Sequence, residues 1–149
     1  MPVTLILLIS VLLARDDAPK TTVLTATKLG KVVTLAQALA PLGLTFDKEP
    51  VAKQMVLLEA GGTITPLLSD DASRAFFLDD RVRDRKVEIK GRLLKGSPYF
   101  QVVTFKIEDG GRLRTPEYYC EICSISVRYP QDCPCCQGAL IYRMKPDEP

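Results

Sequence analysis

Every cysteine of this chain lies in one short stretch near the C-terminus, and that clustering constrains the fold more than any other feature. All five cysteines fall within residues 120–136, and the chain contains no histidine. Two Cys-x-x-Cys pairs, separated by nine residues, account for four of them: Cys120, Cys123, Cys133 and Cys136. Two such pairs joined by a hairpin bring four sulfurs to tetrahedral corners, the geometry of a closed structural zinc site. The spacing therefore predicts one metal ion held by these four thiolates.

The size of the cysteine-containing segment favours a metal over disulfides. A unit of about 30 residues cannot bury enough apolar surface to fold alone. Structural zinc contributes about 10–16 kcal/mol in peptides, whereas a disulfide contributes about 2–4 kcal/mol. An odd number of cysteines also leaves one thiol without a disulfide partner. Two disulfides, or an iron site used in redox chemistry or electron transfer, are the alternatives. Haem attachment is excluded because Ser124 and Gln137, rather than histidines, follow the pairs.

The sequence around the two pairs, CEICS and CPCCQG, resembles the knuckle turns of zinc ribbons and rubredoxins over residues 117–143. In such turns, backbone N–H groups point at the first thiolate. Gly138 is expected to allow a close backbone approach that a side chain would hinder. Two features depart from the zinc-ribbon pattern, since the spacer is short and Cys135 lies inside the second pair. The choice of ligands among Cys133, Cys135 and Cys136 therefore stays open.

Upstream of the cysteines, turn signals separate several segments with strand character. Apolar or alternating patterns predict strands at residues 54–59, 63–68, 87–94 and 99–107. Pro66 places the second of these at a sheet edge. A further strand is expected at residues 30–35, running into a short helix that Pro41 and Gly43 end.

A short helix is expected between the strands at residues 63–68 and 87–94. Ser69 or Asp70 is expected to cap it. Its expected buried side consists of Ala75, Phe76, Leu78 and Val82. The resulting order is three strands, a short helix and two strands, which is the plan of the five-stranded Greek-key barrel called the OB-fold.

The predicted fold class is therefore mainly β. We expect an OB-like barrel with one short helix at residues 19–110, and a small zinc ribbon with a polar tail at residues 111–149. The phrase VEIKGRLLKG followed by YFQVVTFKI resembles the last two barrel strands of many OB domains, in which a glycine bends the strand. Another small antiparallel β protein, such as a sandwich, is the alternative.

The N-terminal residues 1–18 have the pattern of an export signal. Residues 3–14 form an apolar run that is too short to span a bilayer of about 30 Å as a helix. The run fits the apolar region of a signal peptide, although no Lys or Arg precedes it. We therefore expect a periplasmic or secreted protein with no membrane span in the mature chain. A buried first strand is the other interpretation of this segment.

The whole arrangement resembles a group of small exported bacterial proteins that pair an OB-like domain with a C-terminal cysteine cluster. The phrases SDDASRAFF, VEIKGRL, QVV, YYCEICSI and CPCCQGAL carry this resemblance. It implies export and metal binding, and it implies no particular activity.

A basic stretch with aromatic neighbours offers a second candidate site. The proposed ligand-binding residues are Arg83, Arg85, Lys90, Arg92, Tyr99 and Phe100. OB domains hold single strands with cationic grooves and stacked aromatic rings, but a net charge of +2 is far from the basic footprint of a nucleic-acid-binding domain. An anionic polysaccharide or an acidic protein partner would use the same charges, and a solvated strand face is the simpler interpretation.

The residue types present favour binding over catalysis. Without histidine, the chain lacks the commonest general base and any Ser-His or Cys-His pair. The expected function is a non-enzymatic binding or scaffold module stabilised by zinc. The alternatives are a redox or electron-transfer protein that uses the cysteine pairs, and a single-stranded nucleic-acid binder.

Overall fold

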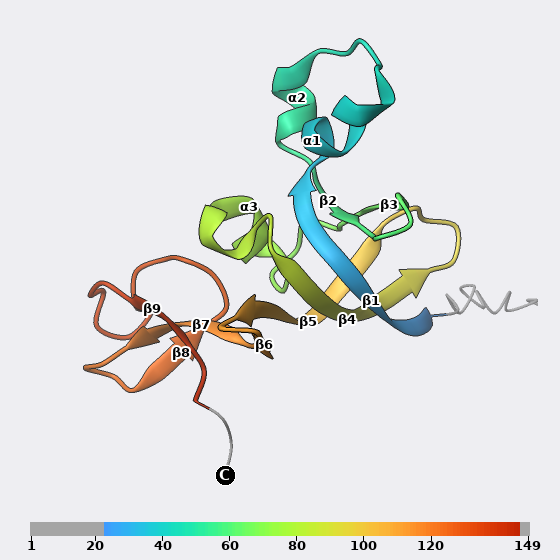
Figure 1. Ribbon diagram of the computed structural model, residues 1–149. Coiled ribbons are helices and arrows are strands. Elements are labelled where there is room, and N and C mark those ends of the chain that lie inside the picture. The colour runs from blue at the N-terminus through green and yellow to red at the C-terminus, as the bar shows by residue number, and fades with distance from the viewer. Residues whose placement is uncertain (1–22, 147–149) are drawn as a thin grey trace, which may run out of the picture.

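The computed structural model describes residues 23–146, which form two antiparallel β-sheets and a few short helices (Figure 1). The larger sheet has six strands in the order β3-β2-β1-β4-β5-β6. Their bounds are β1 Val23–Thr34, β2 Met55–Leu58, β3 Ile64–Pro66, β4 Lys86–Leu94, β5 Phe100–Asp109 and β6 Arg112–Arg114. The smaller sheet has the order β8-β7-β9, with bounds β7 Pro116–Cys120, β8 Ile125–Val127 and β9 Ile141–Met144. The expected mainly β class is confirmed.

The helical segments of the described residues are all short. They are α1 Leu35–Leu39, η1 Ala40–Leu42, α2 Lys48–Ala52, α3 Arg74–Leu78 and η2 Asp80–Val82. Among the described residues, no helix is long and apolar enough to cross a membrane. The expected export signal, residues 1–18, lies outside the described residues.

The expected five-stranded fold requires a closed barrel. The larger sheet does not close into a continuous barrel. Leu67, the residue after β3, forms an isolated parallel bridge with Phe100 of β5. There the Leu68 N–H donates a hydrogen bond of 3.0 Å to the Phe100 carbonyl. The sheet also gains β6, which pairs with the end of β5. Residues 112–114 therefore belong to the six-stranded sheet.

Strand β1 is much longer than the expected segment at residues 30–35 and ends one residue earlier, at Thr34. Its first part pairs with β4 and its last four residues pair with β2. Thr34 then caps α1, because its hydroxyl accepts the Gln37 N–H at 3.1 Å and the Gln37 side chain accepts the Thr34 N–H at 2.9 Å. The expected helix is confirmed as α1, which ends at Leu39. The 3-10 turn η1, which contains Pro41, follows it and is capped by Gly43 with a φ of 67°. Helix α2 was not expected.

The β2–β3 hairpin and the β4–β5 pair form close to the expected positions. Strand β3 contains Pro66 and lies at an edge of its sheet, as expected. In β4, the register shifts between Lys90 and Gly91, which leaves Val103 of β5 as an extra residue. Gly91 leaves room for β5, since a Cβ added there would be 2.3 Å from the Gln101 carbonyl oxygen.

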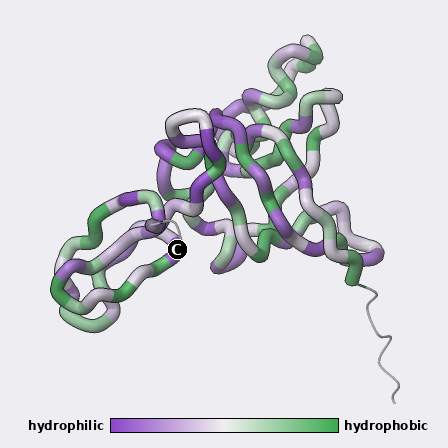
Figure 2. Tube along the Cα trace, turned by 60° about the horizontal axis from the view of Figure 1, so that its bottom comes forward, coloured by the Kyte–Doolittle hydropathy of each residue, from purple (hydrophilic) through white to green (hydrophobic). Residues whose placement is uncertain are grey.

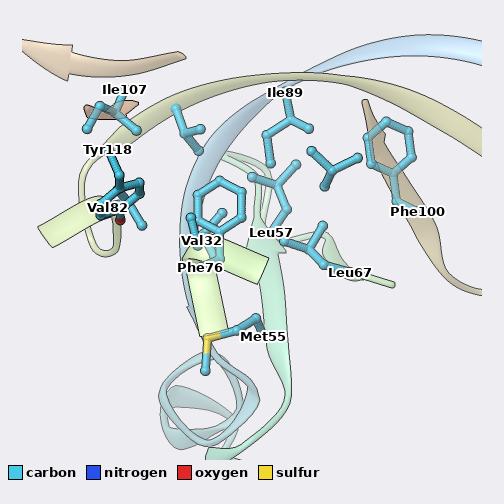
Figure 3. Packing of buried hydrophobic residues seen from close by; sticks show 13 residues of the cluster. Val32, Met55, Leu57, Leu67, Phe76, Val82, Ile89, Phe100, Ile107 and Tyr118 are labelled. Atoms are coloured by element: carbon cyan, nitrogen blue, oxygen red, sulfur yellow. The ribbon is translucent and has the colours of Figure 1, made fainter. Parts of the chain in front are cut away.

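Alternation along the long strands places one face of the larger sheet in the core. Figure 2 shows hydrophobic and hydrophilic residues alternating along these strands. Phe76 of α3 enters the core between Val32, Leu57 and Ile89 (Figure 3), and its ring centre lies 4.3 Å from that of Phe105. Tyr118 of the smaller sheet belongs to the same buried cluster. The two sheets therefore share one hydrophobic core.

The helix after β3 differs in part from its sequence prediction. Helix α3 begins at Arg74, and neither Ser69 nor Asp70 is its N-cap. The Asp70 carboxylate instead accepts the Ser73 N–H at 3.4 Å, in a turn that precedes the helix. Ala75 and Phe76 are buried as expected, and so is Val82 in η2, but the expectation for Leu78 was wrong because it is 56% exposed.

Candidate metal centre

The smaller sheet positions the cysteines at its two connections. Strand β7 ends at Cys120, and the turn that contains Cys123 leads directly into β8. The other pair, Cys133 and Cys136, lies in the loop between β8 and β9. Strand β7 is central in this sheet and pairs with both β8 and β9. Its backbone pairing therefore holds the two loops at the same end of the sheet.

The four expected ligands come together in the structure. The sulfurs of Cys120, Cys123, Cys133 and Cys136 all lie within 4.8 Å of one another. The Cys120 and Cys136 sulfurs are 3.6 Å apart. Cys120 and Cys133 are buried, Cys123 is half-buried and Cys136 is exposed. The cluster could therefore hold a metal ion at this end of the sheet.

Backbone N–H groups point at the sulfurs, as expected for knuckle turns. The Cys123 N–H donates to the Cys120 sulfur at 3.4 Å. A hydrogen bond from the Cys136 backbone lowers the pKa of Cys133 to about 7, against the opposing effect of burial. The turn itself is held by the Cys133 N–H, which donates to the Gly138 carbonyl at 2.9 Å. These donors stabilise the thiolate, which is the form that binds metals.

Both knuckles end in a residue with a left-handed backbone. Ser124 has a φ of 54° and Gln137 has a φ of 60°. Each immediately follows the second cysteine of its pair, so the two turns have matching backbones. The expectation for Gly138 needs correction, because a Cβ there would only touch the Cys136 sulfur at 3.4 Å. Gln137, rather than Gly138, takes the conformation that favours glycine.

The fifth cysteine lies beside the cluster without belonging to it. Cys135 is exposed and is not one of the four mutually close sulfurs. It still affects the site, because a hydrogen bond with the Cys135 thiol is the main cause of the raised pKa of Cys123. All five cysteines are free thiols in the structure.

Of the six residues of the basic and aromatic candidate site, Phe100 and Arg83 are taken up inside the fold. Phe100 is fully buried in the core and so cannot stack on a ligand. The Arg83 guanidinium donates to the Phe76 and Phe77 carbonyls at 2.7 and 3.2 Å, so it supports the turn after α3. Lys90 and Arg92 lie exposed on β4, Tyr99 precedes β5 at the surface, and Arg85 is half-buried.

The junction between the two sheets contains a polar cluster that the sequence did not indicate. Asp79, only 6% exposed, accepts hydrogen bonds from the Tyr118 hydroxyl at 2.6 Å and from the Arg81 Nη2 at 2.7 Å. Burial would raise the pKa of Asp79, but the hydrogen bonds from Arg81 and Tyr118 outweigh it and lower the pKa to about 2. The Arg81 guanidinium also lies 4.2 Å from the centre of the Tyr142 ring. This cluster joins η2 to β7 and β9.

Comparison with family models, with curated proteins and with solved structures finds no match to this chain. The functional argument therefore rests on the geometry of its own residues.

Proposed function

We propose that this protein is an exported binding or scaffold module whose smaller sheet is stabilised by one structural zinc ion. The observation that carries the proposal is the convergence of four cysteine sulfurs, from two knuckle turns, within 4.8 Å of one another. Zinc–sulfur bonds of about 2.3 Å place tetrahedral sulfurs about 3.8 Å apart. The 3.6 Å between the Cys120 and Cys136 sulfurs fits that spacing.

The ligand chemistry supports zinc in a closed site. Four cysteine thiolates form a typical structural zinc set, which leaves no open position for a substrate. Iron bound by the same four sulfurs would instead support electron transfer. Colour separates these two ions, because zinc is colourless and iron–thiolate sites absorb visible light. We propose zinc because it supplies the folding free energy that a sheet of three short strands needs.

The finer assignment of the larger sheet to an OB-like Greek-key barrel is part of this proposal. Its support is the pairing of β1 with both β2 and β4, together with the position of α3 between β3 and β4. The parallel bridge between Leu67 and Phe100 adds to that support, since it joins the residue after β3 to β5. OB domains use their strands and loops as binding surfaces. A binding role, rather than catalysis, agrees with a chain that has no histidine.

Export is proposed from the apolar run at residues 3–14 alone. An oxidising compartment would favour disulfides over metal thiolates. Zinc must therefore bind before the thiols oxidise, or bind fast enough to protect them. Mapping the N-terminus of the mature protein tests this part of the proposal. An intact N-terminus on protein recovered from the cytoplasm would contradict it.

The zinc proposal is tested by elemental analysis and a free-thiol count on protein purified from its native compartment. We expect one zinc per chain and no disulfide. The Cys123→Ser variant should lose the metal and the order of the smaller sheet, while the matched Cys135→Ser variant should keep one zinc per chain. Cys135 is the matched control because its sulfur lies outside the cluster. Stoichiometric iron would favour the electron-transfer alternative, and bridged sulfurs without metal would contradict the proposal.

A further inference from the structure

A groove runs along β5 where the two sheets meet. Its larger hollow, of about 500 Å³, lies between residues 103–105 of β5 and the β7 and β8 strands. A smaller hollow of about 290 Å³ adjoins it, toward Lys90 and Lys106. Thr104, Phe105, Thr115 and Lys145 line both hollows, so the two form one groove. The larger hollow alone falls within the size range of ligand sites, about 300–1,000 Å³.

The larger hollow has an apolar wall that the β-bulge keeps open. Val103 is the unpaired residue of the bulge, between the pairs formed by Val102 and Thr104, and it is 36% exposed. Phe105 and Val127 form further apolar parts of the lining. Bulges re-aim side chains and occur often beside functional sites. The bulge thus turns an apolar side chain of a long strand toward a hollow instead of into the core.

The rim of the groove carries excess positive charge. Lys90, Lys106 and Arg128 line it, and none of them forms an ion pair with another described residue. Two carboxylates also lie along the groove, those of Glu88 and Glu117.

The Glu117 carboxylate is already satisfied inside the smaller sheet. It accepts hydrogen bonds from the Arg143 Nε and the Ser126 hydroxyl, both at 2.7 Å. Glu88 stands opposite Lys106 in the β4–β5 register, so it offsets one of the three cations. The remaining charge on the rim is positive, and it is complementary to an anionic partner.

We infer that this groove binds an acidic protein segment. An apolar side chain of the segment enters the larger hollow, and flanking carboxylates lie against Arg128, Lys106 and Lys90. The inference rests on the proposed binding function and names its partner class. Charge alone would accept any polyanion. The apolar hollow favours a peptide, because peptides offer side chains that can be buried beside charged groups, as in the core and rim of protein interfaces.

The test uses a fluorescein-labelled peptide with one phenylalanine flanked on each side by three glutamates, followed by fluorescence anisotropy. We expect saturable binding that weakens as salt rises. Replacing the phenylalanine by glycine should weaken binding on the order of tenfold, the effect of one buried aromatic side chain. The same peptide with lysines in place of glutamates should not bind. Absence of binding by the acidic peptide would overturn the inference.

Substitutions then locate the binding site. Arg128→Glu and Val103→Ser should each weaken the acidic peptide's binding, the former on the order of tenfold. Lys53→Glu makes the same charge change at an exposed residue just after α2, far from the smaller sheet in Figure 1, and should leave affinity within about twofold. Unchanged peptide affinity in both groove variants would show that the peptide does not bind in this groove.

Two further measurements separate this inference from other outcomes. A heparin oligosaccharide and a single-stranded oligonucleotide should bind more weakly than the peptide, and equal or tighter binding by either would refute a peptide-specific groove. Zinc content is measured on the same samples. If the protein holds one zinc per chain but does not bind the peptide, the inference that the groove binds an acidic segment is wrong, and the proposal of a zinc-stabilised module is unaffected.

Discussion

The hydrogen bond between Tyr118 and Asp79 offers the sharpest test of how the two sheets are joined. Tyr118→Phe removes only the hydroxyl, which donates at 2.6 Å to a buried carboxylate. Buried hydrogen bonds to charged groups are worth about 1.5–3 kcal/mol. In this variant the Asp79 carboxylate still accepts hydrogen bonds from Arg81, whose Nη2 and Nε donate at 2.7 and 2.9 Å. We therefore expect a loss of about 2 kcal/mol in the free energy of unfolding.

That loss should appear in both thermal and acid unfolding. For a chain of this size, about 2 kcal/mol corresponds to a midpoint roughly 4–8 °C lower by circular dichroism. The variant should also raise the pKa of Asp79 above its value of about 2. Carbon-13 NMR of the Asp side chains measures that pKa directly. Tyr119→Phe, on the same strand, is the matched control and should change the free energy of unfolding by less than about 0.5 kcal/mol.

Two results would refute this reasoning. One is an unfolding midpoint for Tyr118→Phe equal to that of the Tyr119→Phe control. The other is an unchanged pKa for Asp79 in the variant. A double-mutant cycle with Asp79→Ala, which removes the acceptor, isolates the pairwise term, which should be at least about 1 kcal/mol for residues in direct contact.

Three further outcomes are expected. Gly91→Ala should destabilise the larger sheet by about 2 kcal/mol or more in urea unfolding, because its Cβ would meet the Gln101 carbonyl oxygen at 2.3 Å; a stable variant would show that β5 can move away. Thr34→Ala should cost about 1 kcal/mol through loss of the capping box with Gln37, and Thr34→Ser should restore it. Asp79 has a pKa below the ordinary 3.8, so its contribution of about 2 kcal/mol is present above that pH and is lost as the pH falls toward 2; a free energy of unfolding that stays flat over this range would contradict it.

The sequence predicted the parts of the structure that depend on local spacing. The two cysteine pairs and the β2–β3 hairpin are short-range patterns, and the structure confirms both. Helix α2 was not predicted; its Pro50 lies in the first turn, where proline is tolerated, and Asp47 supplies the cap.

Contacts between residues far apart in the sequence could not be predicted from it. The contact of Tyr118 with Asp79 joins residues 39 positions apart, and no periodicity signals it. Phe100 and Tyr99 are adjacent aromatic residues, yet only Phe100 is buried, because successive side chains of an extended chain point to opposite faces. The bridge between Leu67 and Phe100 likewise depends on where two segments distant in the sequence meet in space.

The outermost strands of the larger sheet also limit how the molecule can misassemble. Both β3 and β6 are three residues long, and they contain a proline and two arginines respectively. Short, charged or proline-bearing borders give a neighbouring chain little backbone to pair with. At these two borders, copies at high concentration therefore find no long template on which to add strand to strand.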